Sequence, residues 1–396
     1  MRQLAILCSL SALLLACSPP QRLTAVPNEL YTDAAVPGMA NVRYFIDADP
    51  QPIIEHAFQS IERERAWRAK SGQSVDLPPA VFLAVSGGGD NGAFGAGLLV
   101  GWSQTGNRPE FKIVTGISTG ALIAPFAFLG PDYDDQLREV FTTISAKDIL
   151  KKRGLLGIVF GESAADNAPM WNLVRKHADA AMLQAIGEEY DKGRLLLIAT
   201  TNLDAQRPVV WNIGEIAKSD HPKALELFHS VLIASAAIPG AFPPVMIDVT
   251  VDGQTYQEMH VDGGTIAQVF IYPPSINVEE AAQKFGVQRE RELYIIRNAR
   301  LDPEWATVER YIFDIAGRAI STLIQNQGVG DLYQIFLTAE RDNIDYNLAF
   351  IPSTFDAVHK EAFDTEFMNK LFDLGFAMAK AGYPWEKFPP GYNPDD

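Results

Sequence analysis

The sequence predicts an α/β protein with a largely parallel central sheet. Continuous apolar strands alternate with helical runs in "VFLAVSGGGDNGAFGAGLLVGW" (81–102) and again in "FKIVTGISTGALIAPFAFLG" (111–130). A third apolar strand, "RLLLIATTNL", covers 194–203. Strands buried on both faces have this composition, and helices between them are typical of parallel connections. With 396 residues, 47% of them hydrophobic, the chain can bury a large core.

The remaining elements follow in chain order. "VRYFID" (42–47) predicts an edge strand, and 53–70 predicts a surface helix because its apolar residues recur at helical spacing, ending at "SGQSVDLPP". A helix and a Pro-Gly loop are expected over 231–245, a hairpin over 246–264, and a buried strand at "ELYIIRNA" (292–299). Residues 301–380 are expected to be mostly amphipathic helix.

The N-terminus predicts export and lipid attachment. A short positive start, an apolar run over 4–16 and "LLLA" before Cys17 resemble a bacterial lipoprotein signal, in which the cysteine is acylated and retained. An ordinary secretory signal is the alternative. We expect a signal peptide over 1–16, a lipid-anchored tether over 17–40 and one domain over 41–396. The expected location is the bacterial cell envelope, at the outer membrane rather than the inner one.

Charge and cysteine content exclude several classes of partner and cofactor. The net charge of −16 argues against nucleic acid, because a phosphate backbone repels a negative surface. Both cysteines, Cys8 and Cys17, lie in the signal segment, so they support neither a disulfide nor a zinc site in the body. The six histidines are scattered without metal-binding spacing. No metal and no cofactor are expected.

The glycine turn after the first strand allows three interpretations. Gly87, Gly89 and Gly92 match G-x-G-x-x-G, but the second strand ends without the acid that a dinucleotide site needs. A P-loop fails because Ala93 stands where lysine is required. An oxyanion hole fits better, since successive glycines let backbone N–H groups converge on one oxygen. A tight turn that needs glycine only for its backbone is the structural alternative.

Ser118 is a candidate nucleophile. It stands between Gly116 and Gly120, where an apolar strand passes into an apolar helix, and this arrangement exposes a nucleophilic serine in hydrolases. A serine that merely caps the helix is the alternative. The later histidines have surface or core contexts: His177, His221, His229 and His359.

Two aspartates compete as the proton acceptor. Asp262 follows a strand in "VDGG", whereas Asp252 precedes a glycine in a typical hairpin turn. Spacing alone does not choose between them. His260 shares a strand face with Asp262, so it could orient the acid or replace it.

Four blocks in order, "SGGGDNGAFGAGLL", "GISTGA", "SAAIPGAFPPV" and "VDGG", resemble the motifs of patatin-like phospholipases over about 80–300. The resemblance implies a three-layer α/β/α fold and hydrolysis of lipid acyl esters by a Ser-Asp dyad, without histidine or metal. It makes 41–396 an acyl hydrolase domain with a C-terminal helical part over 301–396. Carried over by motif, Ser118 is the nucleophile and Asp262 the base in Asp262-Gly263-Gly264. The amides of Gly87, Gly88 and Gly89 would form the oxyanion hole.

The resemblance is incomplete at Asp90-Asn91, where the family commonly has a basic residue. Two rival functions stay open: an esterase with a Ser-His-Asp triad, and an inactive binding lipoprotein. The expected partners are a phospholipid or other acyl ester and the membrane that holds the anchor. The segment 151–171, which combines basic, apolar and flexible residues, is expected to be a mobile cover over the acyl site, and a plain surface loop with a buried apolar anchor is the alternative.

Overall fold

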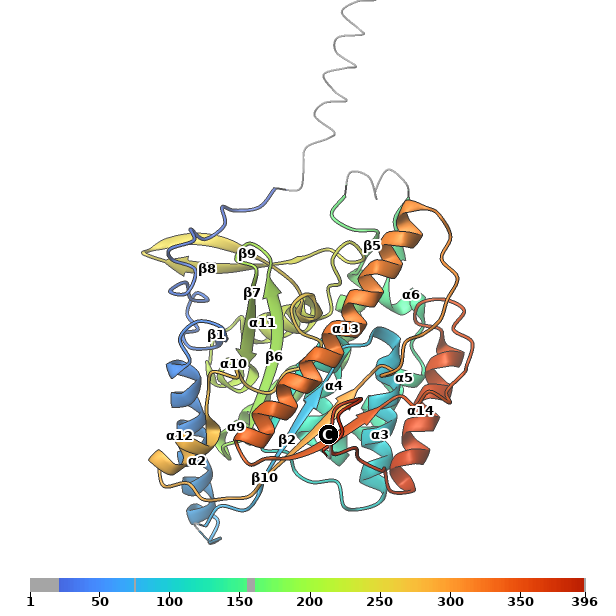
Figure 1. The fold of residues 1–396 in the computed structure, drawn as a ribbon. Helices are drawn as coiled ribbons and strands as arrows, with labels where there is room; N and C mark the ends of the chain where they lie inside the picture. The colour runs from blue at the N-terminus through green and yellow to red at the C-terminus, as the bar shows by residue number, and fades with distance from the viewer. Residues whose placement is uncertain (1–20, 75, 155–160, 395–396) are drawn as a thin grey trace, which may run out of the picture.

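The computed structural model describes residues 21–74, 76–154 and 161–394 (Figure 1). The predicted signal peptide and Cys17 therefore lie outside the described residues. Within the described part, no helix has both the length and the apolarity needed to cross a bilayer.

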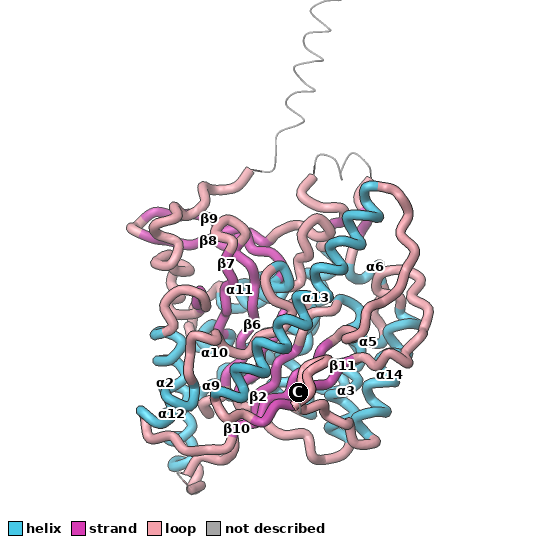
Figure 2. The backbone as a smooth tube through the Cα atoms, viewed as in Figure 1, coloured by secondary structure: helices cyan, strands magenta, loops and turns pink. Residues whose placement is uncertain are grey.

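A mostly parallel sheet forms the centre of the molecule (Figure 2). Five strands run parallel in the spatial order β6-β3-β2-β10-β11. At the β6 edge, β7 pairs antiparallel with β6 and β1 pairs antiparallel with β7, while the hairpin β8–β9 joins the far end of β6. The strands are β1 (Arg43–Phe45), β2 (Ala80–Val85), β3 (Ile113–Ile117), β6 (Leu195–Asn202), β7 (Arg207–Asn212), β8 (Val245–Val251), β9 (Gln254–Asp262), β10 (Arg291–Arg297) and β11 (Asp345–Phe350).

Helices cover both faces of this sheet. The first face packs its buried side chains, such as Leu83 and Val114, against one group of helices, and the second packs Phe82 and Ile295 against α13. The first group comprises α3 (Gly92–Gln104), α4 (Thr119–Leu129), α5 (Asp134–Thr142), α9 (Ala180–Asp191), α11 (Ala224–Ser235) and α14 (Thr365–Lys380). The second comprises α2 (Gln51–Lys70), α12 (Val278–Lys284) and α13 (Ile312–Arg341). The predicted α/β class, with three layers and a mostly parallel sheet, is confirmed.

Short elements complete the connections. The pair β4 (Lys151–Lys152) and β5 (Ala165–Asp166) lies outside the main sheet. Three short helices are α6 (Ala146–Ile149), α8 (Ala168–His177) and α10 (Ile213–Lys218). The C-terminal part is less helical than expected, because β11 stands between α13 and α14 and pairs in register with β10.

Glycines bring α3 and α14 into backbone contact. A Cβ atom on Gly97 would overlap the carbonyl oxygen of Phe372, and one on Gly375 would overlap that of Phe94. Only residues without a side chain let two helices approach so closely, so this pair fixes the outer layer beside the glycine loop.

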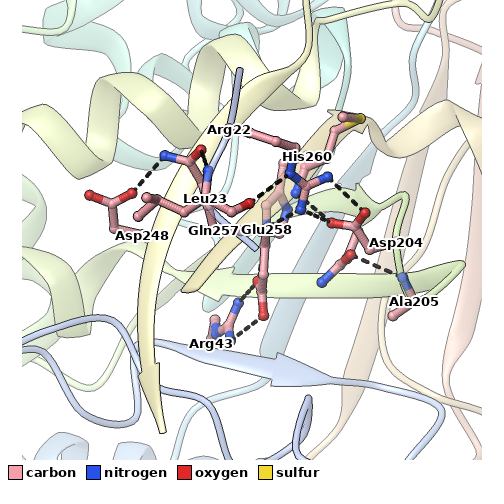
Figure 3. Close-up of polar contacts among 11 residues, drawn as sticks. Arg22, Leu23, Arg43, Asp204, Ala205, Asp248, Gln257, Glu258 and His260 are labelled. Carbon is pink, nitrogen blue, oxygen red and sulfur yellow. Dashed lines mark hydrogen bonds and ion pairs between the residues drawn. The ribbon is translucent and has the colours of Figure 1, made fainter. Parts of the chain in front are cut away.

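The stretch that follows Gln21 is bound to the body rather than free (Figure 3). The Arg22 guanidinium donates two hydrogen bonds to Asp204, at 2.8 and 2.7 Å, and a third to the Gln257 carbonyl. Further along, Ala34, Val36 and Met39 are buried. This differs from the expected tether over 17–40, because polar composition concealed these specific partners and three buried apolar side chains.

Candidate functional site

The length of β6 brings the two predicted catalytic residues together. On one edge, β6 pairs with β3 as far as Ala199↔Ile117, and its next residue, Thr200, pairs with Asp262 at the end of β9. The opposite edge is occupied by β7 over the same stretch. The end of β9 therefore meets the end of β3, and Asp262 lies directly beyond Ile117, beside Ser118.

Ser118 occupies a strained turn between β3 and α4. Its backbone has φ 56° and ψ −125°, which a residue with a side chain seldom adopts. The Ser118 N–H donates to the Ser235 hydroxyl at 2.9 Å, and that hydroxyl donates to the Ala199 carbonyl at 2.7 Å. The turn is thus held by α11 and β6, and Ser118 is 8% exposed.

The Ser118 hydroxyl donates a 2.6 Å hydrogen bond to Oδ2 of Asp262. The other carboxylate oxygen, Oδ1, accepts from the Gly264 N–H at 2.7 Å. Asp262 is 4% exposed, and this burial raises the pKa of its carboxyl to about 7, against the opposing effect of both hydrogen bonds. A carboxylate with a pKa near neutrality is a far better proton acceptor than a solvated aspartate.

The glycine loop after β2 is fixed by Asn298, which follows β10. The Asn298 N–H donates to the Ser86 hydroxyl at 2.8 Å, and its side-chain amide donates to the Ser86 carbonyl at 2.9 Å. A Cβ atom on Gly88 would overlap the Asn298 carbonyl oxygen, and Gly89 has φ 59°. Glycine is therefore needed at both positions for close approach and for a left-handed backbone.

The three predicted oxyanion donors are not equivalent. The Gly87 N–H already donates to the Gln268 carbonyl at 3.0 Å, so in this structure it is not available to a substrate oxygen. Among the described residues, the N–H groups of Gly88 and Gly89 have no acceptor. Of the expected set, the available N–H groups are those of Gly88 and Gly89, because the loop that contains Gln268 already uses the Gly87 amide.

The other motif glycines allow backbones to touch around the site. A Cβ atom on Gly92 would meet the Thr119 hydroxyl, and one on Gly120 would meet the Val85 carbonyl. A Cβ atom on Gly263 would meet the Ala199 carbonyl. These contacts draw the two strand-to-helix turns and the "VDGG" turn onto one another.

His260 does not contact the Ser118–Asp262 pair, although it lies two residues from Asp262. Its Nδ1 bonds the Thr200 hydroxyl at 2.9 Å. Its Nε2 bonds Glu258 at 3.0 Å, and Figure 3 shows these two residues together. Burial lowers the pKa of the His260 imidazole, so the neutral ring is favoured. The carboxylate of Glu258 also pairs with Arg43, which makes this a structural cluster between β9 and the N-terminal segment.

The remaining histidines have other partners or positions. His229 bonds the Ala178 carbonyl at 2.7 Å, and His359 bonds Asp90 at 2.6 Å. None of the chain's histidines, all of which the structure describes, hydrogen-bonds Ser118 or Asp262. Asp252 has φ 51° and precedes Gly253 at the tip of the β8–β9 hairpin, as its sequence predicts.

Asp90, where the family commonly has a basic residue, binds the C-terminal part of the chain. Its Oδ2 accepts from the Phe363 N–H at 2.8 Å and contacts His359. The departure from the family pattern thus has a structural use, which is to hold the segment before α14 against the glycine loop.

Arg297 and Gln268 also surround the site, and the sequence did not single them out. Arg297 ends β10, is 2% exposed, and burial lowers the pKa of its guanidinium to about 10. Gln268 is held by α13, since its N–H donates to Asp331 at 2.6 Å and its side chain to Gln327 at 3.0 Å. Their only sequence signal is position: Arg297 is the last residue of a strand and Gln268 follows the "VDGG" motif.

An apolar cavity and the segment 151–171 do not contribute to the described Ser118–Asp262 site. An apolar cavity of about 160 Å³ between α2 and the sheet is lined by Ile113 and Phe82 at the lower part of the strands, and its lining includes neither Ser118 nor Asp262. The expected cover over 151–171 is described only in part, as β4, β5 and the start of α8, because 155–160 lie outside the described residues. Across the described chain, no three His, Cys, Asp or Glu side chains group as a metal site requires.

Three comparisons with known proteins extend these observations. The comparison with curated protein sequences gave no match. The crystal structure of VipD from Legionella pneumophila is similar, with 12% sequence identity, a TM-score of 0.34, and coverage of 76% of this chain and 66% of VipD. A scan against family models matched residues 83–273 to the patatin-like phospholipase family. The matched segment, which is similar to the patatin-like phospholipases, contains the glycine loop, Ser118 and Asp262.

Proposed function

We propose that this protein is a serine hydrolase that cleaves carboxylic esters of lipids, with Ser118 as nucleophile and Asp262 as its only protein base. The observation that carries the proposal is the 2.6 Å hydrogen bond from the Ser118 hydroxyl to a buried carboxylate. The family match supports a lipid acyl ester as the substrate.

The proposed reaction has two stages. Oγ of Ser118 attacks the ester carbonyl carbon while its proton passes to Oδ2 of Asp262, and the tetrahedral intermediate collapses with the proton returning to the leaving alcohol. Water then attacks the acyl-serine ester, giving its proton to Asp262. Collapse of this second intermediate releases the fatty acid and returns the proton to Ser118.

The oxyanion of each intermediate would be stabilised by the amides of Gly88 and Gly89. One such donor contributes about 3 kcal/mol to the transition state in comparable hydrolases. Because Asn298 and the close contacts of Gly88 fix the loop in advance, little reorganisation is needed as the charge develops.

We also propose that Cys17 carries the lipid anchor and holds the enzyme at the bacterial outer membrane. The support is the lipoprotein-like signal and the serine that follows the cysteine. Fatty-acid labelling that Cys17→Ala abolishes is the expected result, and a variant labelled and trimmed as before would contradict it.

The dyad is tested by single substitutions assayed on a soluble short-chain ester. Ser118→Ala and Asp262→Asn should lose most of kcat, whereas Asp252→Ala and His260→Gln should stay within about tenfold of the parent, or 1.4 kcal/mol. A fluorophosphonate probe should label the parent and fail to label Ser118→Ala, and thermal melts check that each variant folds. A loss in a folded His260→Gln as large as that in Ser118→Ala would favour the triad, and an unlabelled, inactive parent would favour a binding protein.

A further inference from the structure

The N-terminal half of α13 and the segment before it present large apolar side chains to solvent. Trp305 is 89% exposed and Ile312 is 77% exposed. The C-terminal half of the same helix is different, because Leu332 and Phe336 are buried against the sheet. We define the apolar tip as six exposed side chains: Trp305, Tyr311, Ile312, Ile315, Ile320 and Leu323.

This helix passes directly beside the candidate site. Gln327 accepts from Gln268, whose carbonyl binds the Gly87 N–H, and Gln327 also donates to the Ile266 carbonyl. Ile320 and Ile324 lie seven and three residues before Gln327, so they share its face of the helix. The exposed half therefore continues outward from the site along the same face.

The position of the tip favours a membrane as its occupant. The blue trace of the described chain begins at the same end of the molecule as the N-terminal end of α13 (Figure 1). The proposed anchor at Cys17 is only a few residues earlier. Tryptophan and tyrosine have one apolar and one polar part, which suits the boundary between lipid and water.

The charge of this region indicates how it would bind. Residues 300–324 hold three arginines and four acidic residues, giving a net charge of −1: Arg300, Arg310, Arg318, Asp302, Glu304, Glu309 and Asp314. Such a surface gains nothing from an anionic membrane. Contact would depend on burial of the apolar side chains and would be insensitive to salt.

We propose that the apolar tip inserts into the surface of a lipid bilayer and places the Ser118 site at that surface. This inference rests on the proposed function, because insertion would bring the site to its substrate, a lipid of the same bilayer.

The test uses the full lipidated chain in phosphatidylcholine vesicles whose acyl chains carry bromine. Subtracting the tryptophan fluorescence of Trp305→Phe from that of the parent gives the signal of Trp305 alone. We expect bromine to quench this signal clearly at both low and high salt. The matched control introduces Leu337→Trp into Trp305→Phe, because Leu337 is 63% exposed in the C-terminal half of α13. Quenching at 305 and not at 337 is expected, whereas equal quenching or none at 305 would overturn the proposal.

Activity gives a second readout. The triple variant Ile312→Ser, Ile315→Ser, Leu323→Ser should lose at least tenfold on vesicle phospholipid and change less than twofold on a soluble short-chain ester, and Leu337→Ser should change neither. Equal losses on both substrates would overturn the proposal, as would a tip-dependent dimer that forms without quenching at 305. Failure of the proposed function looks different: Trp305 would be quenched in a parent that hydrolyses no ester.

Discussion

Asp262 is subject to two opposing influences on its ionisation. Burial disfavours the carboxylate, while the hydrogen bonds from Ser118 and Gly264 favour it, and burial prevails. A base for serine must be ionised before reaction yet basic enough to take the proton, and a pKa of about 7 meets both needs. The proposed hydrolysis thus depends on a negative charge whose burial in the folded chain costs free energy.

The first prediction concerns pH. The kcat/KM value on a soluble ester should rise about tenfold per unit below pH 7 and become constant above it, because only ionised Asp262 accepts the proton. A profile governed by a much lower pKa would contradict the assigned base.

The same pKa has a consequence for stability. In the folded chain the pKa of Asp262 is raised above its unfolded value, so the folded state binds more protons between about pH 4 and 7. Its contribution to the free energy of unfolding therefore falls as pH rises through this window. In urea denaturation, the parent should lose roughly 2–3 kcal/mol more than Asp262→Asn between pH 5 and pH 8.

At this scale, sequence motifs could predict which residues to examine but not all of their partners. Ser118 and Asp262 stand in recognisable frames, and the structure places them in contact. The engagement of the Gly87 amide, and the roles of Ser235 and Asn298 in holding the turns, depend on strand register between distant segments. No local pattern carries that register.

At the scale of elements, the contact between α3 and α14 makes a specific prediction about two glycines. Gly97→Ala should lower the free energy of unfolding by at least about 2 kcal/mol, because its new Cβ would overlap the Phe372 carbonyl and separate the helices. Gly330→Ala is the matched control within α13, where a Cβ atom meets nothing within 4 Å. It should raise the free energy of unfolding by about 0.5–1 kcal/mol. Denaturant titration of both variants checks the pair, and equal effects would contradict the close packing.

The buried parallel strands were predictable as elements because their sequences are continuously apolar, as in β2 and β10. β11 was not, since "DYNLAF" begins with polar residues and resembles the end of a helical region. Its Asn347 is buried and its side chain donates to the Leu293 carbonyl at 3.3 Å. A polar residue inside a strand hides the element when only apolar periodicity is considered.

For the whole molecule, the segment matched by the family model is not expected to fold alone. β2 lies between β3 on one side and β10 on the other, and β10 falls after residue 273. A chain ending at Pro273 would expose the inner edge of β2 and the face of α3 that packs on α14. We expect this chain to be insoluble or to lack a cooperative thermal transition. A soluble fragment with a sharp melt would show that the C-terminal part is a separable unit.

The binding of Arg22 to Asp204 and Gln257 limits how far the folded body can lie from an anchor on Cys17. From Cys17 to Arg22 there are five Cα-to-Cα steps, which span at most about 18 Å. With an acyl anchor on Cys17, the body could not move farther than this from the bilayer surface. A tether this short makes contact between the apolar tip and the membrane intramolecular, with an effective concentration of about millimolar or higher. A surface of only millimolar intrinsic affinity would then be bound much of the time, so six apolar side chains could suffice where a freely diffusing enzyme would need a larger patch.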